Sequence, residues 1–167
     1  MVKLRWMVRC GCCAALVSVC AWLAVPVGEI SVTMQTFGVF LTLLLLGGGK
    51  GTATVAVYLL LGAVGLPVFT GFQGGIGVLL GPTGGYLWGL LMACLGFWLL
   101  ERRLPAWLLM ILGQLLCYAC GTAWFYFAYT GGGLWAVVLK CVLPYVIPDA
   151  CKLLLAWYLA KRLKKIV

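Results

Sequence analysis

Apolar residues dominate six runs of the chain, and short segments rich in glycine, proline or basic residues separate these runs. The runs cover approximately residues 10–27, 32–46, 52–64, 83–100, 105–129 and 148 to the basic C-terminal segment. A helix of roughly 20 apolar residues crosses a hydrocarbon core of about 30 Å, and the third run is short for that length. The pattern predicts an all-α integral membrane protein with six transmembrane helices in a single domain over residues 1–167, with a glycine-rich loop between helices three and four.

The N-terminal sequence MVKLRWMVRC, followed by an apolar run, has the charge pattern of a signal peptide. The run continues to Val27, and no convincing small-x-small cleavage site follows it. The segment VSVC before Ala21 has Val19 where a lipoprotein cleavage site requires a small residue. We therefore expect the first helix to be retained.

The composition excludes a soluble globular protein, because the chain has too few charged residues to cover an apolar core in water. Of 167 residues, 65% are hydrophobic and 9% are charged, and the mean hydropathy is +1.16, whereas a soluble domain carries roughly 25% charged residues. The net charge of +9 raises the question of a nucleic-acid partner, but the basic residues lie in short clusters between apolar runs. That placement is a topology signal, so we expect a surrounding lipid bilayer and no nucleic acid.

The basic clusters fall on one side of the membrane when six spans are threaded in order. Because Lys and Arg are enriched in cytoplasmic loops, this predicts a multi-pass protein with both termini cytoplasmic. Only Glu29 and Lys140 charge the other side. The basic residues concerned are Lys3, Arg5, Arg9, Lys50, Arg102, Arg103, Lys161, Arg162, Lys164 and Lys165.

The stretch GLPVFTGFQGGIGVLLGPTGGYLWG, at 65–89, contains nine glycines and no charge. Glycine lets backbone approach another group closely, and irregular backbone at membrane depth is tolerated where it is buried in protein or lines a cavity. We expect the loop over 65–82 to fold back over a ligand, although a plain packing loop has the same composition. The aromatic residues of the stretch are either pocket walls or an interfacial belt, and Gln73 either meets a ligand or satisfies loop backbone.

Nucleotide-binding patterns fail at specific positions. GGGKGT at 47–52 has Leu44 where a phosphate-binding loop needs glycine and Gly51 where it needs Ser or Thr. GGIGVLLG has Leu80 where the dinucleotide pattern needs its third glycine. The chain has no histidine and only three acidic residues, so few side chains are available for hydrolytic catalysis. We therefore expect no enzyme, no catalytic residues and no cofactor.

Nine cysteines include two pairs with CxxC spacing, Cys10 with Cys13 and Cys117 with Cys120. That spacing resembles half of a zinc or redox site, but both pairs fall in or beside apolar runs. Cysteine also packs as a small apolar residue in protein interiors. We interpret these cysteines as packing residues and expect no metal site.

The segment PDACK, at 148–152, brings two ionisable residues together. Pro148 is typical of a helix start, and Asp149 beside it suits the positive helix end. Asp149 and Lys152 are three residues apart, so they share a helix face. Ionisable residues within membrane spans are costly and face a cavity or each other. The pair is therefore either an internal ion pair that fixes the helix or a site for a small ligand with N–H donors and a carboxylate.

Four segments, in this order and spacing, resemble the BioY family. They are VTMQTF at 32–37, YLLLGAVGLPVFTG at 58–71, LLGPTGGYLWG at 79–89 and VLPYVIPDACK at 142–152. BioY proteins are the biotin-binding substrate-specific (S) subunits of energy-coupling-factor (ECF) transporters. The resemblance implies the S-component fold, a six-helix membrane bundle with a substrate site near the outer surface. Loops between helices one and two, three and four, and five and six close that site in the family.

The resemblance implies high-affinity biotin binding and biotin uptake across the bacterial plasma (inner) membrane. Such a subunit has no ATP site, so a coupling (T) subunit and ABC-type ATPases are the implied partners. Asp149 can accept from a ureido N–H of biotin, and Lys152 can face either end of the ligand. The substrate-binding residues implied in this way are Asp149, Lys152, Gln73, Phe72, Gly74, Gly75, Gly84, Gly85 and Tyr86.

Two other functions stay open from the sequence. One is an S-component-like subunit for another vitamin, and the other is a non-transporting membrane scaffold whose ion pair in the sixth helix is structural. Family members that dock on a shared coupling subunit carry alanines every fourth residue in the first helix. Here Gly11–Ala15 and Ala14–Ser18 fit a small-xxx-small spacing, and Val19 interrupts its continuation.

Overall fold

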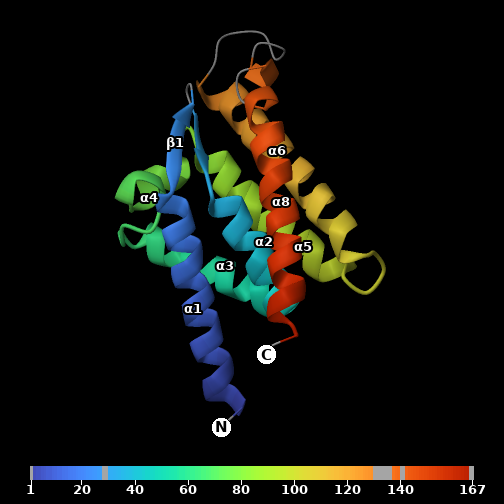
Figure 1. The fold of residues 1–167 in the computed structure, drawn as a ribbon. Coiled ribbons are helices and arrows are strands. Elements are labelled where there is room, and N and C mark those ends of the chain that lie inside the picture. Colours follow the sequence, from blue (N-terminus) through green and yellow to red (C-terminus); the bar gives the residue numbers. More distant parts are fainter. Residues whose placement is uncertain (1, 28–29, 130–136, 140–141, 166–167) are drawn as a thin grey trace.

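The computed structural model describes the chain except residues 1, 28–29, 130–136, 140–141 and 166–167. Helices dominate it, and a two-stranded hairpin lies toward the end of the bundle opposite to the two termini (Figure 1). The elements are α1 (Val2–Trp22), β1 (Ala24–Val27), β2 (Ile30–Thr33), α2 (Gln35–Leu46), α3 (Gly48–Ala63), a 3₁₀ turn (Thr70–Phe72), α4 (Ile76–Leu80), α5 (Gly84–Leu100), α6 (Ala106–Tyr129) and α8 (Leu143–Leu163).

Helix α2 forms the centre of the bundle. Most of its residues are buried, and Phe40 and Leu43 have no exposed surface. The helix packs mainly against α1, α3 and α8. It contains no charged residue, as expected for a helix that has apolar neighbours on every side.

Helices α5 and α6 pack closely because glycine lies under large side chains. A Cβ at Gly85 would come 2.2 Å from Cβ of Trp124, and a Cβ at Gly121 would come 2.2 Å from the ring of Tyr86. Such contacts hold helices together in lipid, where burial from water does not drive association. The glycine positions therefore fix how α5 and α6 approach, and with them one wall of the cavity described below.

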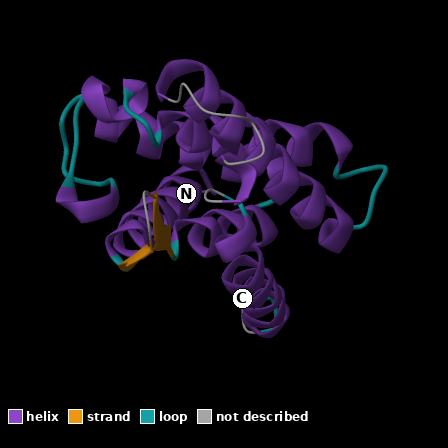
Figure 2. Cartoon of the chain, turned by 90° about the horizontal axis from the view of Figure 1, so that it is seen from above, coloured by secondary structure: helices purple, strands orange, loops and turns teal. Residues whose placement is uncertain are grey.

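A short hairpin replaces the end of the first predicted helix. Helix α1 ends at Trp22, and β1 pairs antiparallel with β2; Figure 2 shows the two strands at the edge of the helices. The β-branched residues of both strands favour extended backbone, and Pro26 is tolerated in an edge strand. The prediction of an all-α chain whose first helix reaches Val27 is therefore wrong for this segment, and the fold is mostly helical.

The last helix begins earlier than predicted. Helix α8 starts at Leu143, so Pro148 lies inside the helix and not at its start. Pro144, in the first turn, sits where a missing N–H costs little. Pro148 lacks the N–H that would bond to the carbonyl four residues earlier, and the surrounding bundle holds the helix in spite of that loss. The prediction that Asp149 lies at the positive helix end is accordingly wrong.

The glycine-rich segment between α3 and α5 is partly helical and is tied to α3. It contains the 3₁₀ turn and α4. The Tyr58 hydroxyl donates to the carbonyl of Val68 at 3.1 Å, and the Gly75 N–H donates to the carbonyl of Gly62 at 2.7 Å. These bonds satisfy backbone groups that have no partner within a regular element.

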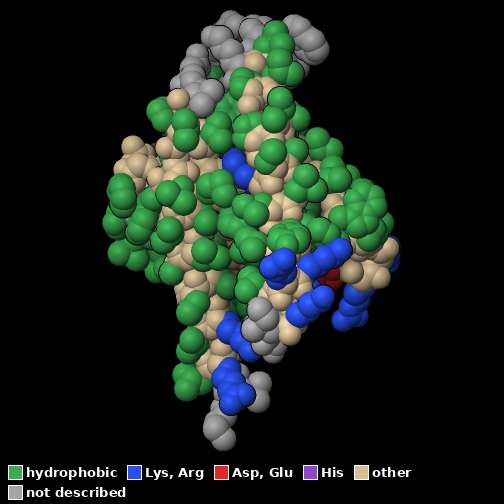
Figure 3. Space-filling model, viewed as in Figure 1, with side chains coloured by type: hydrophobic (Ala, Val, Ile, Leu, Met, Phe, Trp, Pro, Cys, Tyr) green, Lys and Arg blue, Asp and Glu red, His purple; other side chains and the backbone are tan. Residues whose placement is uncertain are grey.

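Hydrophobic side chains cover most of the face seen in Figure 3, and the charge gathers at one end of it. Leu4–Trp22 and Ala106–Ala128 are long and apolar enough to cross a membrane by length and composition, and Gln35–Leu46 and Gly84–Leu100 are shorter apolar helices. Figure 3 shows hydrophobic side chains over most of the visible face, with Lys and Arg concentrated toward the end that carries the termini. Glu29 and Lys140, predicted on the opposite side, lie outside the described residues.

Candidate functional site

A cavity of about 320 Å³ lies among segments that are far apart in the sequence. Its walls come from β2, the start of α2, the glycine-rich segment, α4, α5, α6 and α8. Small-molecule pockets are typically about 300–1,000 Å³, so the volume suits a small ligand. Among the residues that line it, the charged ones are Asp149 and Lys152.

These two residues of α8 form a buried ion pair. Asp149 is 6% exposed and Lys152 is 7% exposed. Lys152 Nζ donates to Asp149 Oδ1 at 2.7 Å. The spacing of three residues predicted that both side chains share a helix face, and the structure places them together on the cavity wall.

Two side chains of α6 complete the hydrogen bonding of the carboxylate. Gln114 Nε2 donates to Asp149 Oδ2 at 2.9 Å, and the Tyr118 hydroxyl donates to the same oxygen. Burying a charge is costly unless it is paired and hydrogen-bonded, and Asp149 has three donors from two helices. This cluster of Asp149, Lys152, Gln114 and Tyr118, called the polar cluster below, gives the cavity an end where anionic, cationic and amide groups meet.

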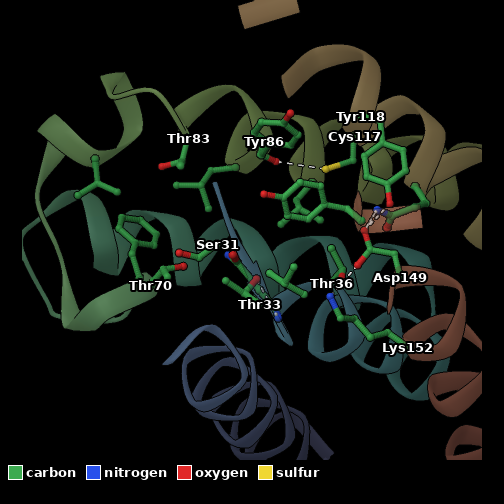
Figure 4. A pocket seen from close by; sticks show the side chains of 18 of the residues that line it. Ser31, Thr33, Thr36, Thr70, Thr83, Tyr86, Cys117, Tyr118, Asp149 and Lys152 are labelled. Carbon is green, nitrogen blue, oxygen red and sulfur yellow. Dashed lines mark hydrogen bonds and ion pairs between the residues drawn. The ribbon is translucent and has the colours of Figure 1, made fainter. Parts of the chain in front are cut away.

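The other end of the cavity carries hydroxyl groups in place of charge. Figure 4 shows Ser31, Thr33, Thr70 and Thr83 apart from Asp149, Lys152 and Tyr118. Ser31 and Thr33 come from β2, and Thr70 comes from the glycine-rich segment. The cavity is therefore polar at both ends but ionic at one, so an elongated ligand meets different chemistry at its two ends.

Apolar and aromatic side chains also line the cavity. Phe69, Leu87 and Leu90 line the cavity, and Tyr86 and Tyr145 add aromatic rings. The Phe69 ring is 1% exposed and packs edge-on to Tyr58, with the ring centroids 5.6 Å apart. A ligand with an apolar part fits such a lining because its burial removes apolar surface from water.

Four of the nine predicted site residues line the cavity. They are Asp149, Lys152, Gln73 and Tyr86. The predicted Phe72 is not among the lining residues; it is 64% exposed, and its ring stacks on Trp22 at 4.8 Å. Phe69, another aromatic residue of the glycine-rich stretch, does line the cavity. Trp88, from the same stretch, is 40% exposed and donates from its ring N–H to the carbonyl of Leu79 at 3.2 Å.

Three of the four predicted glycines permit close packing, and Gly75 permits a backbone conformation that other residues rarely adopt. A Cβ at Gly74 would come 2.3 Å from the carbonyl oxygen of Leu66, and one at Gly84 would come 2.0 Å from that of Leu79. Gly75 has a φ of +99°, which strongly favours glycine. Gly85 lies under Trp124, as described above. These glycines are not among the residues that line the cavity.

Sequence reasoning missed the contributions of α6, α2 and β2. Gln114 and Tyr118 bind Asp149 directly, and Gln35 and Thr36 line the cavity from α2. Gln114 is the one amide within the fifth apolar run, and a polar side chain within a membrane span is a signal for a site. The hydroxyls of β2 had no such signal, because the hairpin itself was not predicted.

Comparison with known proteins agrees with the resemblance. A sequence profile of the BioY family matches residues 1–167. The chain belongs to the BioY family. It is 39% identical over 167 residues to "Biotin transporter BioY" of Thermotoga maritima, covering 98% of both chains. It is 39% identical over 150 residues to "Probable biotin transporter BioY" of Pyrococcus horikoshii, covering 90% of both.

A solved structure has the same fold. It is the crystal structure of the S-component for biotin from an ECF-type ABC transporter, with a TM-score of 0.88, 25% identity and coverage of 98% of this chain and 92% of that one. Membership of a transporter family makes this BioY chain a membrane protein and not an enzyme, as the sequence predicted.

Proposed function

We propose that this chain binds biotin as the S subunit of an ECF transporter and takes part in biotin uptake. Its relatives carry the name biotin transporter, and its structural neighbour is an S-component for biotin. The observation that carries the proposal is the buried pair of Asp149 and Lys152 at one end of a cavity of suitable volume. That end supplies both an acceptor and a donor to a ligand.

The polar cluster meets the ureido ring of biotin in this proposal. Asp149 accepts from a ureido N–H, and Lys152 donates to the ureido oxygen, because the two side chains lie at the same end of the cavity. Phe69, Tyr86 and Leu87 cover the apolar face of the bicyclic ring. A ligand without the ureido group leaves buried polar groups unpaired, which is the physical basis for rejecting it.

The carboxylate tail of biotin lies toward the hydroxyl-rich end. Gln73 and the hydroxyls of Ser31, Thr33 and Thr70 are the donors available there. Phe72, Gly74 and Gly75 have an indirect part in this assignment, since they shape the segment that carries Phe69 and Gln73, whereas Gly84 and Gly85 set the packing of α5.

The membrane arrangement and the partners complete the proposal. Helices α1, α2, α3, α5, α6 and α8 are the six transmembrane helices of a single domain over residues 1–167, and the glycine-rich segment between the third and fourth of them is the lid. The gathering of Lys and Arg at the end that carries the termini supports cytoplasmic termini in a bacterial plasma membrane. Uptake then requires a coupling subunit and ABC-type ATPases, because the chain offers no nucleotide-binding loop.

A groove between α1 and α3 is the surface that we assign to the coupling subunit. It encloses about 600 Å³ and is lined mainly by apolar residues. Small residues form much of its α1 side, which lets a partner helix approach the backbone closely. These residues are Gly11, Ala14, Ala15 and Ser18.

Calorimetric titration of biotin into the purified protein in detergent tests the function. We expect tight binding by the wild type and its loss in Asp149→Ala, because the variant removes the acceptor and leaves Lys152 unpaired. Glu101→Gln is the control: Glu101 lies outside the cavity and accepts from the Gly48 N–H at 2.6 Å at the start of α3, and the amide oxygen keeps that acceptor, so biotin binding stays intact.

Other outcomes identify the alternatives. A folded wild type that ignores biotin but binds riboflavin or thiamine in competition measurements is a subunit for another vitamin. A folded wild type that binds none of these ligands, with Asp149→Asn changing stability alone, is a membrane scaffold. Either result contradicts the proposed function.

A further inference from the structure

Gln114 occupies a position in the cavity that its contact with Asp149 does not fully explain. It lies in the middle of α6, is 5% exposed and lines the cavity beside Tyr118. Its amide has two different ends, an NH₂ group that donates and an oxygen that accepts. The contact with Asp149 involves the donating end.

The chemistry of Asp149 fixes which way this amide points. An ionised carboxylate accepts hydrogen bonds and cannot donate, so the NH₂ group must be the end of Gln114 that faces Asp149 Oδ2. The Tyr118 hydroxyl also directs its proton to that oxygen. Gln114 Oε1 is left buried with no donor among the described residues.

A second buried polar atom in the same cavity also lacks a hydrogen-bond partner among the described residues. Thr36 Oγ1 is buried and has no hydrogen-bond partner among the described residues, and Figure 4 places Thr36 near Lys152 and Asp149. Buried polar groups in native proteins are nearly always paired, and each exception calls for a cause. Two unpaired atoms among the residues that line one cavity indicate where complementary groups of a ligand bind.

We infer that Gln114 determines ligand specificity by accepting a hydrogen bond from the ligand at Oε1 while Nε2 positions Asp149. The inference rests on the proposed function. A ureido ring presents two N–H donors on either side of one carbonyl, so a site that reads it fully needs two acceptors and one donor. Asp149 and Gln114 are the two acceptors, and Lys152 is the donor. Gln114 thus selects for the second ureido N–H.

The test combines protein variants with ligand variants. Gln114→Met keeps the length of the side chain and removes both of its polar ends. The matched variant Tyr118→Phe removes a donor from the same Asp149 oxygen but leaves Gln114 in place. Each protein is titrated with biotin and with two cyclic carbamate analogues, in which one or the other ureido N–H is replaced by a ring oxygen.

We expect Gln114→Met to weaken biotin binding by about ten- to hundredfold, the range for an unpaired buried group. It should weaken one carbamate isomer by at least about threefold less than it weakens biotin, because that isomer lacks the N–H that Gln114 accepts and loses only the part of the effect that passes through Asp149. Tyr118→Phe should weaken the binding of that isomer as it weakens the binding of biotin, because Tyr118 acts on the ligand through Asp149.

Two results overturn the inference while the proposed function stands. One is unchanged biotin affinity in Gln114→Met. The other is an equal loss for biotin and both carbamates, which makes Gln114 a positioning residue for Asp149 alone. A wild type that does not bind biotin removes the proposed function itself, and the two failures are therefore distinct. Gln114→Leu repeats the comparison if the Met variant has a lowered melting temperature in detergent.

Discussion

Asp149 is the residue that brings the polar side chains of the cavity together. Its carboxylate receives Lys152 from its own helix and Gln114 and Tyr118 from α6. Replacing a buried ion pair by apolar residues can be neutral, but removing one member leaves a buried charge without compensation. Single substitutions in this cluster therefore report on binding and stability together, and each needs a control elsewhere in the chain.

Lys152→Ala should weaken biotin binding by about 2–5 kcal/mol, as when a buried charge pair loses one member. The loss has two causes, the missing donor to the ligand and the unpaired Asp149 carboxylate. Titration calorimetry in detergent measures it directly. Lys50→Ala, which removes an exposed lysine outside the cavity, is the control and should bind as the wild type does. Equal affinity in Lys152→Ala and the wild type would assign Lys152 a structural role only.

The sequence identifies site residues well where a charged side chain lies within an apolar run. Asp149 and Lys152 were found because charge within an apolar run is costly, and both line the cavity. Gln114 and Thr36 were not found, because an uncharged polar side chain within a helix can also bond to its own backbone or face another helix. Their role follows only from the neighbouring helices that the fold places around them.

At the scale of elements, the glycine-rich segment depends on one residue of α3. Phe69 lines the cavity, and its ring rests against Gly62 on α3. A Cβ at Gly62 would come 2.1 Å from the tip of that ring. The fit of ring and helix therefore holds the segment in place, together with the bond from the Trp22 ring N–H to the carbonyl of Pro67 at 2.9 Å.

Gly62→Ala should lower both stability and biotin affinity. Alanine is favoured over glycine in a helix by about 1 kcal/mol, but overpacking against Phe69 costs about 1–3 kcal/mol. We expect a net destabilisation of about 1 kcal/mol and faster biotin release, because the displaced ring is part of the cavity wall. Melting in detergent and stopped-flow dissociation of labelled biotin measure the two effects.

Gly77→Ala provides the matched control for this prediction. Gly77 lies in α4, and a Cβ there meets nothing within 4 Å. The same substitution should leave stability unchanged or slightly raised and biotin release unaltered. If Gly62→Ala behaves like Gly77→Ala, the contact of Phe69 with Gly62 does not hold the segment.

Apolar periodicity and length predicted most of the helices. The residues of the hairpin and of the start of α8 explain why those two segments were predicted wrongly. The fourth and fifth runs agree with α5 and α6 to within about a residue at each end. The hairpin was missed because its residues, AVPV and ISVT, are as apolar as the helices beside them. The start of α8 was missed because Pro148 resembles a helix start, although the bundle carries the helix through it.

At the scale of the whole molecule, the cavity and the basic residues lie toward opposite ends. The hairpin, whose β2 strand lines the cavity, lies away from the termini, and most Lys and Arg gather near them. In the proposed membrane arrangement, this polarity puts the binding site toward the outer side and the basic end toward the cytoplasm. It also separates biotin binding from assembly, so a variant can lose one and keep the other.

Ala15→Trp should prevent assembly with the coupling subunit and leave biotin binding intact. Ala15 is exposed on α1 and lines the groove between α1 and α3, so an indole there blocks the close approach of a partner helix. The cavity does not include Ala15. Co-purification with a tagged coupling subunit and its ATPases measures assembly, and titration of biotin into the same preparation measures binding.

Cys12→Trp separates this surface from a general effect of a large side chain on α1. Cys12 is exposed on the same helix but does not line the groove, so its replacement should leave both assembly and biotin binding unchanged. Loss of assembly in both variants would mean that any bulk on α1 interferes. Normal assembly of Ala15→Trp would place the coupling subunit on another face of the bundle, since an indole in the groove leaves no room for a helix to pack against its small residues.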